Sequence, residues 1–185
     1  MVRMAKKKSK TSKSKGYIHL YTGDGGGKTT AALGVAMRAV GQGLRVAVVQ
    51  FMKGRKDIGE WKIQKKLGKN FVVYQFGRKE FVDLHHPSDK DVELANQALG
   101  FAKAEIFEKR PPDVVILDEI NIAAAVGLVH ANDVVEMLKK VPRGVDVYMT
   151  GRWAPKEFIE IADYVTVVED KKRPEKMVAR KGIDY

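Results

Sequence analysis

Short apolar runs alternate with amphipathic stretches along most of the chain. The runs that predict strands cover residues 17–21, 45–51, 71–75, 113–117, 145–150 and 164–168. Helical spacing of apolar residues predicts helices over residues 28–40, 60–67, 88–106 and 133–140, and one more near Pro155. Strands that alternate with helices in this way predict an α/β fold, with a mostly parallel central sheet and helices on both faces.

Length and composition fit one globular domain. The chain has 185 residues, of which 44% are hydrophobic and none is cysteine. Such a chain buries a sizeable core without disulfides or thiolate metal sites. No apolar run approaches the roughly 18 residues of a membrane span, and the N-terminus lacks the apolar segment of a secretion signal. We therefore expect a cytoplasmic protein with no membrane contact.

The net charge of +11 is concentrated at the N-terminus. Residues 1–15 carry seven basic residues and no acidic one, so the remainder has a net charge of +4. This Lys/Ser-rich segment lacks helical or strand periodicity, and we expect a disordered basic tail that precedes a domain over residues 16–185. The tail is either a solubilising extension or an electrostatic arm for nucleic acid or another polyanion.

A glycine-rich segment follows the first predicted strand and opens the first predicted helix. Consecutive glycines let backbone N–H groups approach phosphate oxygens, the helix N-terminus adds its positive dipole, a lysine adds a charge and a threonine adds a hydroxyl for Mg²⁺. The usual phosphate-loop spacing requires glycine at position 22, where this chain has Thr22, so the loop is one residue short. The candidate phosphate-binding residues are Gly23, Asp24, Gly25, Gly26, Gly27, Lys28, Thr29 and Thr30.

Two carboxylates and an arginine follow other predicted strands. Asp118 and Glu119 come directly after the apolar run 113–117, and carboxylates at a strand end are typical Mg²⁺ partners in nucleotide sites. Together with Thr29 they are the candidate metal ligands. Arg152 follows the run 145–150 and either binds an anionic ligand or forms a surface ion pair.

Several motifs together resemble the phosphate-loop type of ATP:cob(I)alamin adenosyltransferase. The resemblance begins with the shortened loop in residues 21–32 and covers nearly everything from Gly16 to Tyr185. It continues in residues 49–54 (VQFMKG), 117–123 (LDEINIA), 150–152 (TGR), 161–163 (IAD) and 181–185 (KGIDY). The short loop and the Gly-Ile-Asp-Tyr ending are its most specific features.

The resemblance implies a RecA-like parallel sheet, a homodimer, and ATP, Mg²⁺ and a corrinoid as ligands. The implied reaction transfers the 5′-deoxyadenosyl group of ATP to the cobalt of cob(I)alamin or another reduced corrinoid and releases triphosphate. A reductase would supply electrons to cobalt. On this interpretation Lys28 and Glu119 are the candidate catalytic residues, Asp118 and Glu119 contact Mg²⁺, and no hydrolytic base is needed.

The segment after the third predicted strand departs from the resembled pattern. Family members commonly have an aromatic pair there that covers the lower face of the corrinoid. Here Phe81 takes the phenylalanine position, whereas Asp83 stands where tryptophan is expected. Phe81 is therefore the candidate corrinoid-binding aromatic, with a core position as its alternative.

Two other functional classes share parts of this pattern. A RecA-like ATPase acting on nucleic acid would use the same loop and carboxylates, with the basic tail on the polymer. A nucleotide or corrinoid carrier would bind its ligand without turnover. The adenosyltransferase accounts for the most motifs.

Overall fold

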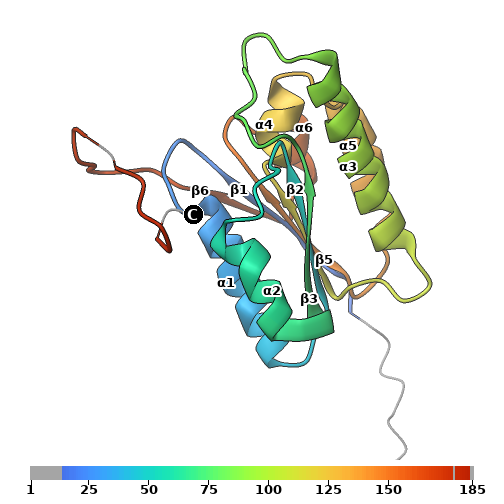
Figure 1. Ribbon diagram of the computed structural model, residues 1–185. Helices are drawn as coiled ribbons and strands as arrows, with labels where there is room; N and C mark the ends of the chain where they lie inside the picture. Colours follow the sequence, from blue (N-terminus) through green and yellow to red (C-terminus); the bar gives the residue numbers. More distant parts are fainter. Residues whose placement is uncertain (1–13, 177, 184–185) are drawn as a thin grey trace, which may run out of the picture.

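The computed structural model describes residues 14–176 and 178–183. It contains strands and helices that alternate along nearly the whole chain (Figure 1). The strands are β1 (Ile18–Thr22), β2 (Val46–Phe51), β3 (Phe71–Phe76), β4 (Val114–Asp118), β5 (Asp146–Thr150) and β6 (Tyr164–Val167). The helices are α1 (Lys28–Gly41), α2 (Gly59–Leu67), α3 (Asp89–Phe107), α4 (Ile120–Ala125), α5 (Ala131–Leu138) and α6 (Lys156–Ile161), with a 3₁₀ turn at Gly68–Asn70.

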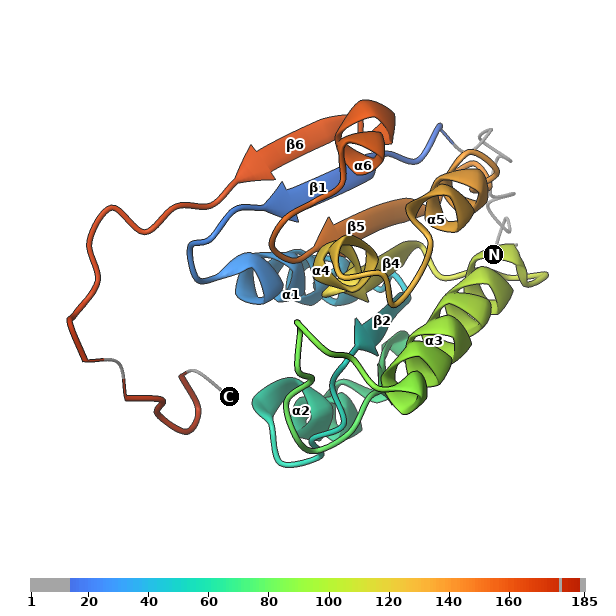
Figure 2. The same ribbon diagram turned by 90° about the horizontal axis from the view of Figure 1, so that it is seen from above.

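All six strands form one sheet in the order β3-β2-β4-β5-β1-β6, and every pair is parallel. The expected α/β fold is thus confirmed, with a sheet that is entirely parallel. Strand β5 separates β1, which leads into the glycine-rich loop, from β4, which ends in Asp118. Figures 1 and 2 show α1 and α2 on one face of the sheet and α3, α4, α5 and α6 on the other.

Alternating side chains of the strands pack into the two helical layers. In β2, Val46 and Val48 join the cluster beneath α1 and α2, whereas Val49 and Phe51 join the larger cluster beneath α3. The side chains of these four residues are almost completely inaccessible to solvent. A strand covered on both faces must be apolar at successive positions, which explains the near-continuous run in the sequence.

The predicted elements agree with the structure apart from a few boundaries and one short helix. Helix α5 begins two residues before the predicted range and also ends two residues earlier. Helix α4 was not predicted, because its six residues are too few to show helical periodicity. Its N-cap, Glu119, has a positive φ of 66°, which turns the chain abruptly out of the sheet.

The last residue of the predicted basic tail contacts the domain. Lys15 was assigned to the tail, but its ammonium group lies 2.9 Å from a carboxylate oxygen of Asp163. The basic segment therefore contacts the domain at its last residue, while residues 1–13 lie outside the described part of the chain. Among the described residues, no helix is long and apolar enough to cross a lipid bilayer.

Strand β6 forms one edge of the sheet and is exposed on both of its faces. Tyr164 is 53% exposed, Val165 is 43% exposed and Val167 is 60% exposed. The neighbouring β1 is its one partner strand in the sheet. An apolar edge strand of this kind is open to pairing or packing with another surface.

Candidate functional site

The glycine-rich loop lies where β1 ends and α1 begins, at the carboxyl end of the sheet, where ligands bind in open α/β folds. Its glycines have different roles. A Cβ at Gly23 would lie 2.4 Å from the carbonyl oxygen of Val168, and one at Gly25 would lie 2.8 Å from the same atom. Gly26 and Gly27 face open space, and Gly27 caps α1 with a φ of 96°. Gly23 and Gly25 allow the backbone at Val168 to pass close to the loop, and Gly27 leads into α1.

Lys28 folds back over the loop that precedes it. Its ammonium group donates hydrogen bonds to the carbonyl oxygens of Gly23 (2.7 Å) and Gly25 (2.6 Å). Burial lowers the pKa of Lys28, while the nearby Glu119 carboxylate partly offsets that effect. The lysine thus lies over the loop at the N-terminus of α1, where the first N–H groups of a helix have no partner within the helix. This arrangement suits an anion with several oxygens.

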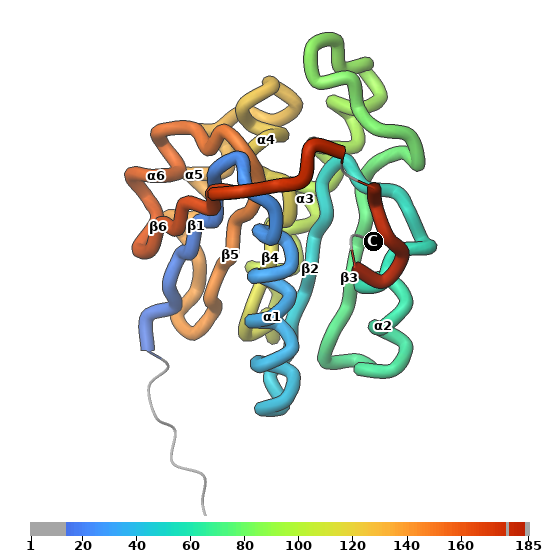
Figure 3. The backbone as a smooth tube through the Cα atoms, turned by 90° about the vertical axis from the view of Figure 1, so that its left-hand side faces the viewer, coloured from blue at the N-terminus to red at the C-terminus, as the bar shows by residue number. Residues whose placement is uncertain are grey.

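The segment that follows β6 is hydrogen-bonded to the glycine-rich loop. The Gly25 N–H donates to the carbonyl oxygen of Val168 at 2.9 Å, and the Gly26 N–H donates to the Asp170 carboxylate at 3.1 Å. Figure 3 shows the segment passing across the top of α1 toward α2. Two loop amides therefore bind this segment, which leaves the N–H groups from Gly27 onward as the candidates for binding an anion.

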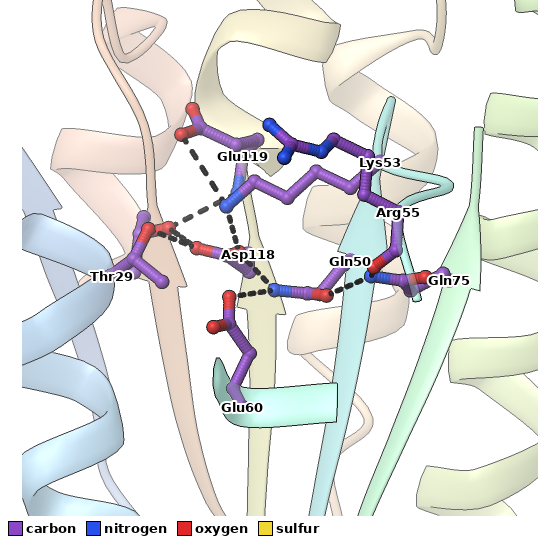
Figure 4. Close-up of polar contacts among 9 residues, drawn as sticks. Thr29, Gln50, Lys53, Arg55, Glu60, Gln75, Asp118 and Glu119 are labelled. Atoms are coloured by element: carbon purple, nitrogen blue, oxygen red, sulfur yellow. Dashed lines mark hydrogen bonds and ion pairs between the residues drawn. The ribbon is translucent and has the colours of Figure 1, made fainter. Parts of the chain in front are cut away.

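Asp118 is the centre of a buried polar network (Figure 4). One carboxylate oxygen accepts hydrogen bonds from the hydroxyls of Thr29 and Thr150, each at 2.7 Å. The other accepts from the ammonium group of Lys53 at 2.6 Å and from the side-chain amide of Gln50 at 3.0 Å. The network thus connects α1, β2, β4 and β5 at one point below the loop.

Electrostatics keep Asp118 ionised despite its complete burial. Burial raises its pKa, but the Lys53 ammonium and the hydrogen bonds outweigh burial, so the pKa lies below its usual value. The pKa of Lys53 is correspondingly raised by Asp118 and Glu119 against the effect of burial. Glu119 behaves differently. Burial and the neighbouring Asp118 charge raise the pKa of Glu119, whose carboxylate lies 4.0 Å from the Lys53 ammonium.

A chain of amides extends this network across the sheet. The Gln50 side chain also donates to Glu60 at 3.1 Å and accepts from Gln75 at 2.9 Å. Gln75 in turn donates to the carbonyl oxygen of Arg55. Figure 4 shows these groups in a row from β4 to β3. The row fixes Glu60, and with it the start of α2, relative to Asp118.

Two cavities meet at this network. The first, of about 440 Å³, lies over the loop and is lined by Gly25, Gly26, Gly27, Lys28, Thr29, Thr30, Leu33, Lys53, Gly59, Glu60, Arg152, Gly182 and Ile183. The structure therefore places Arg152 with the predicted loop residues, together with part of the terminal motif. Tyr185, the last residue of that motif, lies outside the described residues. Gly23 and Asp24 face a separate shallow hollow beside Asp170.

The second cavity, of about 390 Å³, has a largely apolar floor. Phe51, Met52, Ile58, Val82, Leu84 and Ile122 contribute apolar groups, and Phe81 and Glu119 also line it. Lys53 and Glu60 line both cavities. A phosphate-binding cavity and an apolar cavity thus share a wall that contains charged groups.

The segment after β3 forms the outer rim of the apolar cavity. Phe81 is 92% exposed, which excludes the core position considered as an alternative for it. Asp83 accepts hydrogen bonds from the backbone N–H groups of His85 and His86, and these bonds lower the pKa of its carboxyl group. Asp83 is a turn residue, and the flanking Val82 and Leu84 are the ones that line the cavity.

Lys53 is the main site residue that the sequence interpretation missed. It lies two residues beyond β2 and was quoted only within a motif. The rule that ligands bind at the carboxyl ends of parallel strands would have found it. Its position depends on a close crossing, because a Cβ at Gly54 would lie 2.3 Å from the carbonyl oxygen of Gly77. The positive φ of Met52 (58°) contributes to the same turn.

Comparison with known proteins identifies the family of this chain. Residues 14–185 match the family model described as "ATP:corrinoid adenosyltransferase BtuR/CobO/CobP". A corrinoid adenosyltransferase of Sinorhizobium sp. is 36% identical over 195 residues, covering 100% of this chain and 90% of the relative. Those of Escherichia coli K12 (34% identical, 92% of this chain, 86% of the relative) and Salmonella typhimurium (31%, 96%, 89%) are also similar.

A solved structure shares the fold at much lower sequence identity. It is described as a unique ATP synthase subunit NeqB from Nanoarchaeum equitans, with a TM-score of 0.57 and 12% identity. The match covers 84% of this chain and 47% of that one. This likeness concerns the fold, whereas the family model and the sequence relatives span nearly the whole chain at substantial identity. This chain therefore belongs to the ATP:corrinoid adenosyltransferase family.

Proposed function

We propose that this chain transfers the 5′-deoxyadenosyl group of ATP to the cobalt of a reduced corrinoid and releases triphosphate. Family membership supports the reaction, and the observation that carries it is the shared wall of the two cavities. A cavity with loop amides and Lys28 suits a triphosphate, and an adjoining apolar cavity suits a corrin ring. The alternative, an ATPase acting on nucleic acid, gains no support from the family.

The reaction requires little acid or base catalysis from the protein. Reduced cobalt supplies the electron pair that forms the Co–C bond, and the C5′–O bond breaks with its electrons leaving on the triphosphate. The protein has to align C5′ with cobalt and stabilise the departing charge. Lys28 and the amides of the first turn of α1 serve the triphosphate, and Arg152 lines the same cavity. Gly23, Asp24 and Gly25 hold the loop's shape.

We assign Mg²⁺ to the hydroxyl of Thr29 and the carboxylate of Asp118, with Glu119 nearby. Oxygen ligands of this kind fit the ion, and the Thr29 and Asp118 oxygens already lie 2.7 Å apart. When bound, the ion neutralises part of the triphosphate charge. The ammonium group of Lys53 holds the Asp118 carboxylate in its ionised form for that role.

Further parts of the proposal concern partners, the lower corrin face and location. A homodimer fits the exposed edge strand β6, whose apolar side chains a second copy would cover. A reductase fits the chemistry, because cobalt must reach Co(I) before it attacks carbon. Phe81 would help by covering the lower corrin face, and a cytoplasmic location would provide ATP and the reductant.

Product analysis tests the central reaction. Anaerobic incubation with MgATP and chemically reduced cobalamin should give triphosphate and a light-sensitive Co–C product in equal amounts. Release of orthophosphate without a cobalt product would overturn the assignment in favour of an ATPase. Binding of both ligands without any product would indicate a carrier instead of an enzyme.

A further inference from the structure

A strongly basic cavity adjoins the apolar one and has no role in the reaction described above. Its volume is about 610 Å³, and it is lined by Arg55, Lys56, Asp57, Lys62 and Lys79. Four of these five side chains are cationic and one is anionic. Arg55 and Lys79 also line the apolar cavity, so the two cavities are continuous at that wall.

The positive charge of this cavity is only partly neutralised. Asp57 accepts two hydrogen bonds from the Arg55 guanidinium, at 2.8 and 3.2 Å. The Lys62 ammonium donates to the backbone carbonyl oxygen of Asp57, which carries no charge to offset it. Lys56 lies 5.6 Å from the centre of the Trp61 ring. Lys62 also interacts electrostatically with the Asp57 carboxylate. With four cationic side chains and one carboxylate among its lining residues, the cavity keeps an excess of positive charge.

The triphosphate of ATP does not account for this charge. The cavity over the glycine-rich loop and the basic cavity share no lining residue. The basic cavity shares Arg55 and Lys79 with the apolar cavity, so a molecule bound in the apolar cavity can reach it. A cluster of lysines beside an apolar cavity suits a large apolar body that carries an anionic substituent.

We propose that the basic cavity binds an anionic substituent at the periphery of the corrinoid and so selects anionic corrinoids over neutral ones. This inference rests on the proposed function, because it takes the corrinoid as the occupant of the apolar cavity. The corrin ring with its amide side chains offers no negative charge there. The anion is either the phosphodiester of a nucleotide loop or a free carboxylate, which share the chemistry that lysine recognises.

The test compares corrinoids that differ in this charge. Cobalamin carries one phosphodiester, cobinamide lacks it, and a cobyric acid carries a free carboxylate. With each corrinoid reduced beforehand, we expect a lower KM for cobalamin than for cobinamide, by about fivefold to tenfold at low ionic strength. The difference should shrink as salt is added, because partly exposed charges are screened. Equal KM values at all salt concentrations would overturn the proposal.

Variants assign the effect to this cavity. Lys56→Ala combined with Lys62→Ala should raise the KM for cobalamin about fivefold to tenfold and change that for cobinamide less than twofold. The matched control combines Lys65→Ala with Lys66→Ala, exposed lysines of α2 that do not line the cavity. Lys62→Arg should retain the preference. A cobalamin preference that survives unchanged in the first double variant, shown to be folded by its melting curve, would contradict the inference.

The corrinoid with a free carboxylate distinguishes the two anions. If the KM for the cobyric acid is low in wild type and rises in the double variant, the cavity binds anions in general. If the double variant does not change that KM, the cavity binds the phosphodiester. Failure of the proposed function has a different signature, since no corrinoid would then be adenosylated at all. Turnover of all three with one common KM would reject only the basic cavity.

Discussion

The ammonium group of Lys28 donates hydrogen bonds to two carbonyl oxygens of the loop. To bind a triphosphate it needs only to exchange these carbonyl oxygens for phosphate oxygens. We expect Lys28→Ala to lower kcat/KM for ATP by roughly 10²–10³, a typical loss for one such donor. Steady-state rates with reduced cobalamin measure this. Lys109→Ala, a change at an exposed lysine, is the control, and a Lys28→Ala rate near that of wild type would exclude the loop as the triphosphate site.

Glu119 is a carboxylate whose pKa is raised by burial and by Asp118. Because the folded-state pKa is raised, the charged form is populated only above that value. The rate should therefore increase with pH through this range if the charge is used. We expect Glu119→Gln to remove that limb of the pH profile and to raise the Mg²⁺ concentration needed for half-maximal rate, with corrinoid binding less affected. Equal loss of both affinities would count against a role at the metal.

Substitution of Phe81 tests how the lower corrin face is covered. Because its side chain is 92% exposed, Phe81→Ala should leave the melting temperature unchanged. Activity with a weak reductant should fall sharply, whereas activity with preformed Co(I) should fall much less. The electron paramagnetic resonance signal of bound Co(II) with MgATP should change from four-coordinate to five-coordinate. Phe107→Ala, at an exposed position on α3, is the control. A four-coordinate signal that persists in Phe81→Ala would reject the assignment.

Among the elements, α3 is the one whose start is fixed most firmly. Ser88 and Asp91 form a reciprocal capping box. The Arg78 guanidinium adds two hydrogen bonds to Asp91, both 2.9 Å long. These bonds connect the rim of the apolar cavity to α3. The hydrogen bonds from Arg78 lower the pKa of Asp91 to about 2, in spite of its burial.

This lowered pKa makes a pH-dependent contribution to stability. A depressed carboxyl pKa stabilises the fold above the unfolded value near 4, and the contribution is lost as the pH falls through about 2. We expect Asp91→Asn to lose about 1.5–3 kcal/mol of unfolding free energy at pH 7, the usual contribution of a charge-assisted hydrogen bond. Urea denaturation should show the gap to wild type narrowing below pH 4. Asp89→Asn is the control, and a gap that does not depend on pH would contradict the mechanism.

The sequence was most informative where an element is long or its motif is local. The capping signature at Ser88 and the strand-loop-helix order around Lys28 predicted their elements, because hydrogen bonds within a few residues determine both. The relation of Lys53 to Asp118 was not predictable in this way. It depends on the pairing of β2 with β4 and on the crossing of two loops at Gly54 and Gly77. Helix α4 was missed because its six residues, four of them buried, are too few to show a helical spacing of apolar and polar positions.

At the scale of the whole molecule, the two cavities, the carboxylates and Arg152 all lie at the carboxyl edge of one parallel sheet. The resemblance to the family gave the activity, and the family model and the relatives confirm it. That residues 16–185 form one domain after a basic tail stays a prediction, as do the metal ligands and the dimer. Asp83 shows the limit of transferring a motif from a family to this chain. It occupies the position where the family pattern has tryptophan, but here it is a turn residue.

The pairing of β1 has a consequence for how the protein is made. The first strand synthesised lies between β5 and β6, the last two, so its partners are more than 120 residues away along the chain. Contacts so distant in sequence form slowly, since a long loop must close first. The glycine-rich loop, encoded near the start, should therefore take its final shape only after residue 167 has left the ribosome. Nascent chains arrested with residues 1–140 exposed should be cut by protease near the loop, whereas chains with the whole sequence exposed should resist. Protection of the shorter chains would show that β1 finds a stable place without its neighbours.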